Sequence, residues 1–213
     1  MASAGRFVGG AGVAVALVFV LGACGGASKV SATSLEPRLL PASSLPGFKS
    51  VGTRDWSNPV DLAGQGVALP ESTYPSAAVE EFQSAHLKGA AGELLRRGFG
   101  PGQTDIWIGV AEFGSASDAA SVRDWMHGED LQQPCLGACV YRPLPMKLSR
   151  VPDSAAVIQT LFASPPPTPA NYRAEFTIGR YLYWTSFSAD TQAKSEFEAG
   201  VRAYYRHAKK LGG

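Results

Sequence analysis

The stretch YRAEFTIGRYLYWTSF, Tyr172 to Phe187, carries the clearest strand pattern in the chain. In its first half apolar residues alternate with polar ones, as in a strand with one buried face. Gly179-Arg180 fits a two-residue hairpin turn, because glycine tolerates the positive φ angle that the first turn position requires. The stretch therefore predicts an antiparallel hairpin in which Ile178 lies opposite Tyr181 and Tyr172 lies opposite Phe187.

The two faces of this predicted hairpin differ in composition. One face gathers aromatic side chains and Ile178, which have to be covered, most simply by helices. On the other face, Leu182 and Trp184 stand among polar neighbours. Two interpretations remain open for this pair: a loop covers them, or they form an exposed surface that contacts a ligand or a partner. Leu182 and Trp184 are therefore the candidate contact surface.

Further elements follow from periodicity and from glycine and proline breaks. Residues 76–97 show an apolar stripe at helical spacing and end in basic residues, which suit the negative end of a helix. Residues 105–113 are apolar on both faces and predict an interior strand. Helices are also expected from Ser115 or Ser117 to His127 and over 190–211, and strands over 48–56, 146–151 and 155–164.

These elements predict one α+β domain over residues 37–213, with a mostly antiparallel sheet and three helices packed on one face. The element order, together with LLPASSLPGF (Leu39 to Phe48) and EFGSASDAA (Glu112 to Ala120), resembles small exported lipoproteins of actinobacteria. The domains of those proteins are similar to the PsbP/Mog1 sandwich. The resemblance implies a fold and carries no functional residue over.

Residues 1–23 have the composition of a secretory signal peptide. Arg6 precedes an apolar run from Phe7 to Ala23, which is at the short edge for a spanning helix. Leu21-Gly22-Ala23-Cys24 resembles the lipobox of bacterial lipoproteins. In that family the cysteine receives a diacylglyceryl group and a signal peptidase cuts just before it, which implies a lasting lipid anchor at Cys24. The alternative is an uncleaved membrane helix with a chance cysteine.

Residues 24–36 are small and polar, which predicts a flexible tether for a domain on the outer side of the membrane. The chain has 19 Lys and Arg against 18 Asp and Glu, and Arg6 lies in the signal peptide, so the mature protein has no formal net charge. This balance gives no electrostatic footprint for nucleic acid. The expected partners are the membrane, through the anchor, and an unknown envelope protein or a small apolar ligand.

Cys135 and Cys139 form a C-x₃-C pair. Outside the cytoplasm nearby thiols oxidise, so a local disulfide is expected here. A C-x₃-C pair also occurs in copper-delivery proteins of thioredoxin-like fold, which leaves a thiol or copper redox function as an alternative. Two observations stand against it: the residues before Cys135 are polar, and Pro143 and Pro145 follow where those proteins begin a helix.

The chain contains no phosphate-loop, dinucleotide-binding, HExxH or G-x-S-x-G motif. His86, His127 and His207 are dispersed and lack the spacing of metal ligands. No catalytic residue, metal ligand or cofactor is therefore predicted. An envelope hydrolase assembled from distant Ser, His and carboxylate side chains stays open as a further alternative. The expected function is that of a non-catalytic, lipid-anchored binding or interaction module of the cell envelope.

Overall fold

The computed structural model describes residues 34–64, 75–99, 103–132, 141–161, 168–188 and 194–212. The predicted signal peptide lies outside these ranges, as does the predicted tether up to residue 33. Residues Ala32–Gly213 form one compact unit. Among the described residues, two hydrophobic cores are found, and their members all lie between Leu35 and Ala208. We therefore expect the unit to fold without the segment before it.

The described residues form four α-helices, two short 3-10 helices and seven strands. In chain order they are η1 (Glu36–Arg38), η2 (Ala42–Ser44), β1 (Lys49–Trp56), α1 (Pro59–Gly64), α2 (Pro75–Ser84), β2 (Gly89–Arg97), β3 (Thr104–Glu112), α3 (Ala116–Leu131), β4 (Tyr141–Pro145), β5 (Ser154–Leu161), β6 (Thr168–Ile178), β7 (Tyr181–Ser188) and α4 (Lys194–Leu211).

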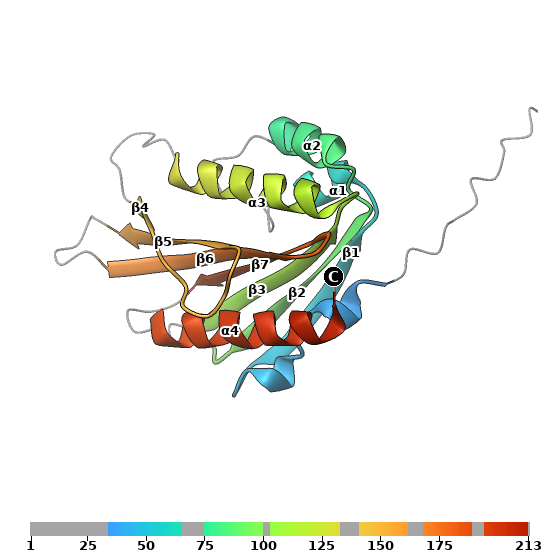
Figure 1. Ribbon diagram of the computed structural model, residues 1–213. Helices are drawn as coiled ribbons and strands as arrows, with labels where there is room; N and C mark the ends of the chain where they lie inside the picture. Colours follow the sequence, from blue (N-terminus) through green and yellow to red (C-terminus); the bar gives the residue numbers. More distant parts are fainter. Residues whose placement is uncertain are drawn as a thin grey trace, which may run out of the picture. The chain divides into compact units, whose positions relative to one another are not determined.

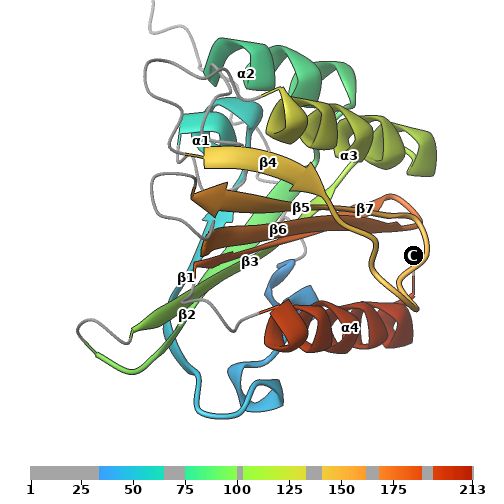
Figure 2. The same cartoon turned by 90° about the vertical axis from the view of Figure 1, so that its left-hand side faces the viewer.

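The described strands form one seven-stranded antiparallel sheet in the order β1-β2-β3-β7-β6-β5-β4 (Figures 1 and 2). The β6–β7 hairpin has the predicted register, with Tyr172 opposite Phe187 and Ile178 opposite Tyr181. Gly179 begins its turn with a φ of 56°, in the region that favours glycine. The predicted α+β class and the antiparallel sheet are confirmed.

Helices cover both faces of the sheet, not one face as predicted (Figure 1). Helix α4 and the segment Leu35–Phe48 cover the aromatic face of the hairpin, and Phe197 and Tyr204 from α4 pack into that core. Helices α1, α2 and α3 cover the opposite face. The physical reason is that this second face is also apolar, since β2, β3 and β7 bring Ala90, Ala111 and Trp184 to it. A sheet that is apolar on both sides needs a layer on each.

The predicted helix over residues 76–97 is half helix and half strand. Helix α2 ends at Ser84, and residues Gly89–Arg97 form strand β2 between β1 and β3. His86, in the connection, has a φ of 56°, which no α-helix allows. The apolar positions that suggested a helical stripe instead alternate across the sheet, with Ala90 in one core and Ala91 in the other.

The predicted strand over residues 146–151 is also wrong. Residues 146–148 are irregular and a turn follows, while the strand that precedes β5 and pairs with it is β4, Tyr141–Pro145. Pro143 and Pro145 exclude a helix, but they are compatible with an edge strand, where the missing N–H groups need no partner. Strand β4 is indeed the edge of the described sheet.

Two tryptophans are accommodated by glycines in the strands beneath them. Gly92 and Gly109 lie opposite each other in β2 and β3, and Gly109 lies opposite Trp184 in β7. A Cβ atom on Gly109 would lie 2.0 Å from Cζ2 of Trp184, and one on Gly92 would lie 2.8 Å from Cη2 of Trp56. Both indole rings can lie flat on the sheet only because these strand positions lack a side chain.

Candidate functional site

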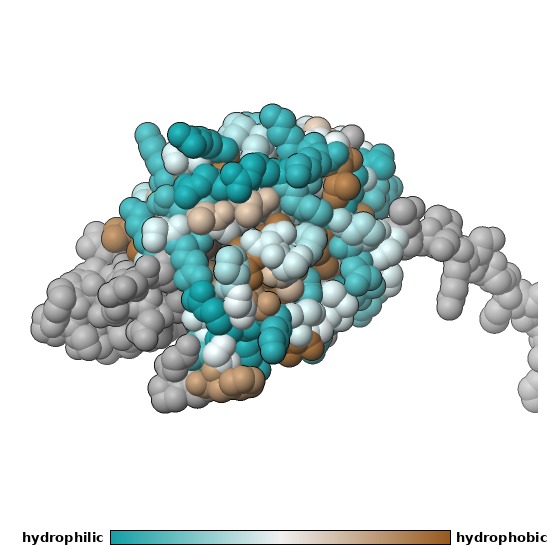
Figure 3. Space-filling view, turned by 90° about the horizontal axis from the view of Figure 1, so that it is seen from below, coloured by the Kyte–Doolittle hydropathy of each residue, from teal (hydrophilic) through white to brown (hydrophobic). Residues whose placement is uncertain are grey.

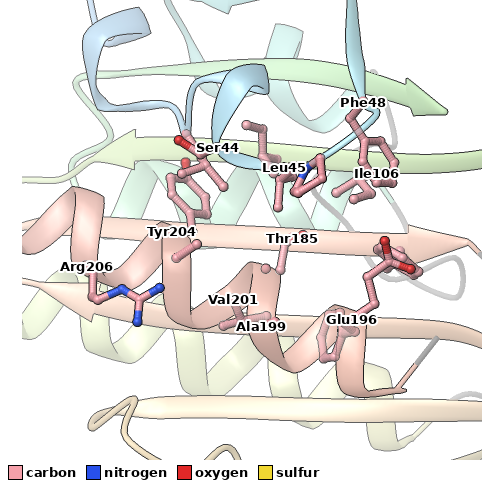
Figure 4. A pocket seen from close by; sticks show the side chains of 17 residues that line it. Ser44, Leu45, Phe48, Ile106, Thr185, Glu196, Ala199, Val201, Tyr204 and Arg206 are labelled. Atoms are coloured by element: carbon pink, nitrogen blue, oxygen red, sulfur yellow. The ribbon is translucent and has the colours of Figure 1, made fainter.

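A cavity of about 240 Å³ lies between helix α4, the η2 segment and the sheet. Figure 3 views this side of the molecule and shows apolar side chains between hydrophilic ones. Figure 4 shows the cavity from close by, with Leu45 and Phe48 above it and Val201 of α4 below. At roughly 30 Å³ per water, the volume equals that of about eight waters. It is therefore large enough for a short hydrocarbon chain.

The lining of the cavity is mainly apolar because four separate segments point their buried faces at it. Ile106 and Ile108 come from β3 and Phe187 from β7, on the face that the hairpin pattern predicted to be apolar. Leu45 follows η2, and Val201 lies on the buried side of α4. Apolar walls with few polar groups are typical of small-molecule sites.

Helix α4 contributes Gly200 to the cavity wall. A Cβ at Gly200 would lie 3.7 Å from Cδ2 of Leu45, an ordinary contact distance, so no clash requires a glycine there. Glycine inside a helix is about 1 kcal/mol less favourable than alanine. The glycine thus weakens the helix at the point where it enlarges the cavity.

The polar side chains of the lining are few, and two of them have partners elsewhere. The Tyr204 hydroxyl donates a hydrogen bond of 2.9 Å to the carbonyl oxygen of Gly109, and burial raises its pKa well above the usual range. The carboxylate of Glu196 pairs with Arg97. Arg206 lines the cavity from an exposed position. Arg206 is a cation of the lining for which no partner was found among the described residues.

A second unusual feature lies on the opposite face, where three charged side chains are buried between α3 and β6. Asp130 and Glu175 are 0% exposed and Arg173 is 7% exposed. The Nε atom of Arg173 lies 3.2 Å from Oδ2 of Asp130 and 3.8 Å from Oε1 of Glu175. One guanidinium thus faces two carboxyl groups that water does not reach.

Burial has a strong effect on the protonation of this charged cluster, Asp130, Arg173 and Glu175. Loss of water raises the pKa of Glu175 from 4.5 to about 8, with the nearby Asp130 charge adding to the effect. Burial also raises the pKa of Asp130. The folded protein therefore holds a proton that the unfolded chain releases at neutral pH. The stability that this proton gives is lost as the pH rises from about 4.5 through about 8.

Leu182 and Trp184 do not form an exposed contact surface, so this prediction is wrong. They are 1% and 2% exposed, respectively. Both belong to the core beneath α1–α3, together with Val122 and Met126 of α3. The physical reason is that a helix covers both side chains, which neither interpretation of the sequence included.

All three cysteines lie outside the described residues. Cys24 belongs to residues 1–33, and Cys135 and Cys139 belong to residues 133–140. The predicted lipid anchor and the predicted disulfide therefore stay predictions.

His127 lines a second cavity with Asp124, Asp153 and Ser154, but the Ser154 hydroxyl donates to the carbonyl oxygen of Val151, and no hydrogen bond joins it to His127 among the described residues. His86 lies 3.7 Å from Asp118 through Nδ1 and Oδ2, but its side chain is 68% exposed. The nearby Ser115 is the N-cap of α3, where its hydroxyl accepts a hydrogen bond from the backbone N–H of Asp118. Within the described ranges, no group of three or more His, Cys, Asp or Glu side chains could hold a metal ion. No described helix is long and apolar enough to cross a membrane.

Comparisons with known proteins establish a fold and no family. The sequence matches no protein-family model and no curated protein. The structure is similar to that of the extracellular domain of PknH from Mycobacterium tuberculosis, with a TM-score of 0.55 at 15% identity, over 83% of this chain and 93% of that one. A putative uncharacterized protein from Mycobacterium smegmatis, an Rv0999 ortholog, matches with a TM-score of 0.42 at 11% identity, over 77% of this chain and 90% of that one. The first similarity, over most of both chains, shows that the domain folds in the manner of that extracellular domain.

Proposed function

We propose that the protein is an extracytoplasmic, lipid-anchored binding module that takes a small, mainly apolar ligand into the cavity between α4, η2 and the sheet. The observation that carries this proposal is the apolar cavity itself, about 240 Å³ in volume. The similarity of the fold to an extracellular domain supports the compartment.

Anchoring rests on the lipobox-like Leu21-Gly22-Ala23-Cys24. Expressed in an actinobacterial host, the full chain should yield a processed protein whose mass includes lipid on Cys24. Cys24→Ser should abolish that lipid-modified form, because the hydroxyl cannot replace the thiol as acceptor. Cys135→Ser is the control and should keep the lipid. If the Cys24→Ser variant were still processed and carried the same added lipid mass as the unsubstituted protein, the anchor would be refuted. The role of the cavity would stay open.

Ligand binding is tested with octanol, a neutral eight-carbon probe, on the unit Ala32–Gly213. Titration calorimetry should detect saturable, submillimolar binding, because each buried CH₂ contributes about 0.8 kcal/mol. Gly200→Leu places a side chain toward Leu45, across the cavity. This variant should stay folded, since leucine favours helix, and it should bind octanol at least tenfold more weakly.

Gly128→Leu is the matched control. Gly128 lies in α3, away from the cavity, and its Cβ would have only Gln132 within 4.0 Å. The control variant should bind octanol as the unsubstituted unit does. If octanol fails to bind, or if Gly200→Leu binds it unchanged, the cavity is not a ligand site.

A further inference from the structure

The charges at the two ends of the cavity differ. Arg206 and Glu196 lie at opposite ends in the close view (Figure 4). Both belong to α4, ten residues apart, which at a rise of 1.5 Å per residue separates them by about 15 Å. The Glu196 end is neutralised because its carboxylate pairs with Arg97. The Arg206 end carries a guanidinium with no such pair among the described residues.

The rest of α4 strengthens this asymmetry. Lys209 and Lys210 follow Arg206 in the last turn, and residues 206–211 contain no acidic side chain. Arg202, one turn earlier, is already paired with Glu198 at 3.2 Å. A helix C-terminus carries roughly −0.5 of an elementary charge, which three full cations outweigh. The mouth of the cavity near Arg206 is therefore positive, whereas the walls beyond it are apolar.

An apolar cavity with a cation at one end fits a molecule that has a hydrocarbon tail and an anionic head. We infer that the ligand is a medium-chain carboxylate, whose tail lies between Leu45 and Val201 and whose carboxylate pairs with Arg206. A guanidinium presents a planar fork of donors that matches the two oxygens of a carboxylate. A neutral alcohol would fill the same cavity without that pair, and an ammonium head would be repelled. This inference rests on the proposed function and adds the chemical class of the ligand to it.

Three eight-carbon probes separate the contribution of the head group to affinity from that of the tail. They are octanoate, octanol and octylammonium, each titrated into the unit Ala32–Gly213 at pH 7. Octanoate should bind about fivefold more tightly than octanol, the size of effect expected for an exposed charge pair. Octylammonium should bind more weakly than octanol. The preference for octanoate should shrink at high ionic strength, because salt screens exposed charges.

Arg206→Gln should remove the preference for octanoate, measured as the ratio of the octanoate and octanol affinities of the same variant. Lys210→Gln is the control, because it removes a cation from the same helix end at a residue that does not line the cavity. It should keep most of the preference. Equal affinities for octanoate and octanol, or a preference that survives Arg206→Gln, would overturn the inference and leave the proposed function standing. If none of the three probes binds, the proposed function fails together with it.

Discussion

Replacing Gly109 by alanine is expected to destabilise the protein by about 3 kcal/mol, the upper part of the range for overpacked cores. A Cβ on this residue would lie 2.0 Å from Cζ2 and 2.2 Å from Cε2 of Trp184. The indole cannot give way easily, because Trp184 is 2% exposed beneath α1–α3. The strand cannot move either, since β3 is paired with both β2 and β7. Urea unfolding of the unit Ala32–Gly213 measures the effect.

Gly52→Ala is the matched control for this substitution. Gly52 also lies in a strand, but no atom lies within 4 Å of its would-be Cβ. The control should be neutral or slightly stabilising, because alanine loses less backbone entropy than glycine on folding. Combining Gly109→Ala with Trp184→Leu should cost less than the two single changes added together. Equal stabilities of the Gly109→Ala and Gly52→Ala variants would mean that Trp184 does not lie where the structure has it.

Replacing Arg173 by methionine is expected to destabilise the protein by about 3–5 kcal/mol at pH 8. The guanidinium is the cation that faces the buried carboxyl groups of Asp130 and Glu175. Methionine fills the space of the side chain but leaves those two groups without the cation closest to them. The same urea measurement reports the loss.

Arg180→Met is the control, because Arg180 pairs with Glu112 at 3.0 Å but has a side chain that is 52% exposed. Such surface pairs contribute about 0–1 kcal/mol. Adding Glu175→Gln to Arg173→Met should recover part of the loss, since glutamine removes one of the two buried charges. The recovery should be larger at pH 9 than at pH 5, because the pKa of Glu175 is raised to about 8. A loss no larger than that of Arg180→Met would contradict the role given to Arg173.

The β6–β7 hairpin could be predicted because its information is local. Alternation of apolar and polar residues sets the two faces, and a glycine with positive φ sets the turn. The pairing of Tyr172 with Phe187 therefore follows from residues within the hairpin itself. The N-cap at Ser115 is similarly local, since it depends on a hydroxyl three residues before Asp118.

Strand β2 could not be predicted for the opposite reason. Its Gly-Ala-Ala-Gly start satisfies a helical spacing as well as an alternating one. The strand instead depends on distant partners, since it is paired with β1 on one side and β3 on the other, and Trp56 of β1 packs over Gly92. Glu175 presents the same difficulty, because a charged residue among polar neighbours is expected to be exposed. It is buried because helix α3 packs against strand β6.

The cavity is the feature of the molecule that is hardest to predict from the sequence. Leu45, Ile106 and Val201 lie in three distant segments, and each alone looks like an ordinary core residue. One signal was present, namely Gly200 in the middle of a helix, a position where glycine is unfavourable. A glycine of this kind is worth inspecting as a cavity wall.

The most direct test of the central claim is to locate octanol on the protein by intermolecular NOEs in a methyl-labelled unit, Ala32–Gly213. Binding in the cavity predicts NOEs from octanol to the methyl groups of Leu45, Ile106 and Val201, and none to Leu62 or Val122 in the opposite core. NOEs confined to the opposite core, or to no methyl group at all, would contradict it.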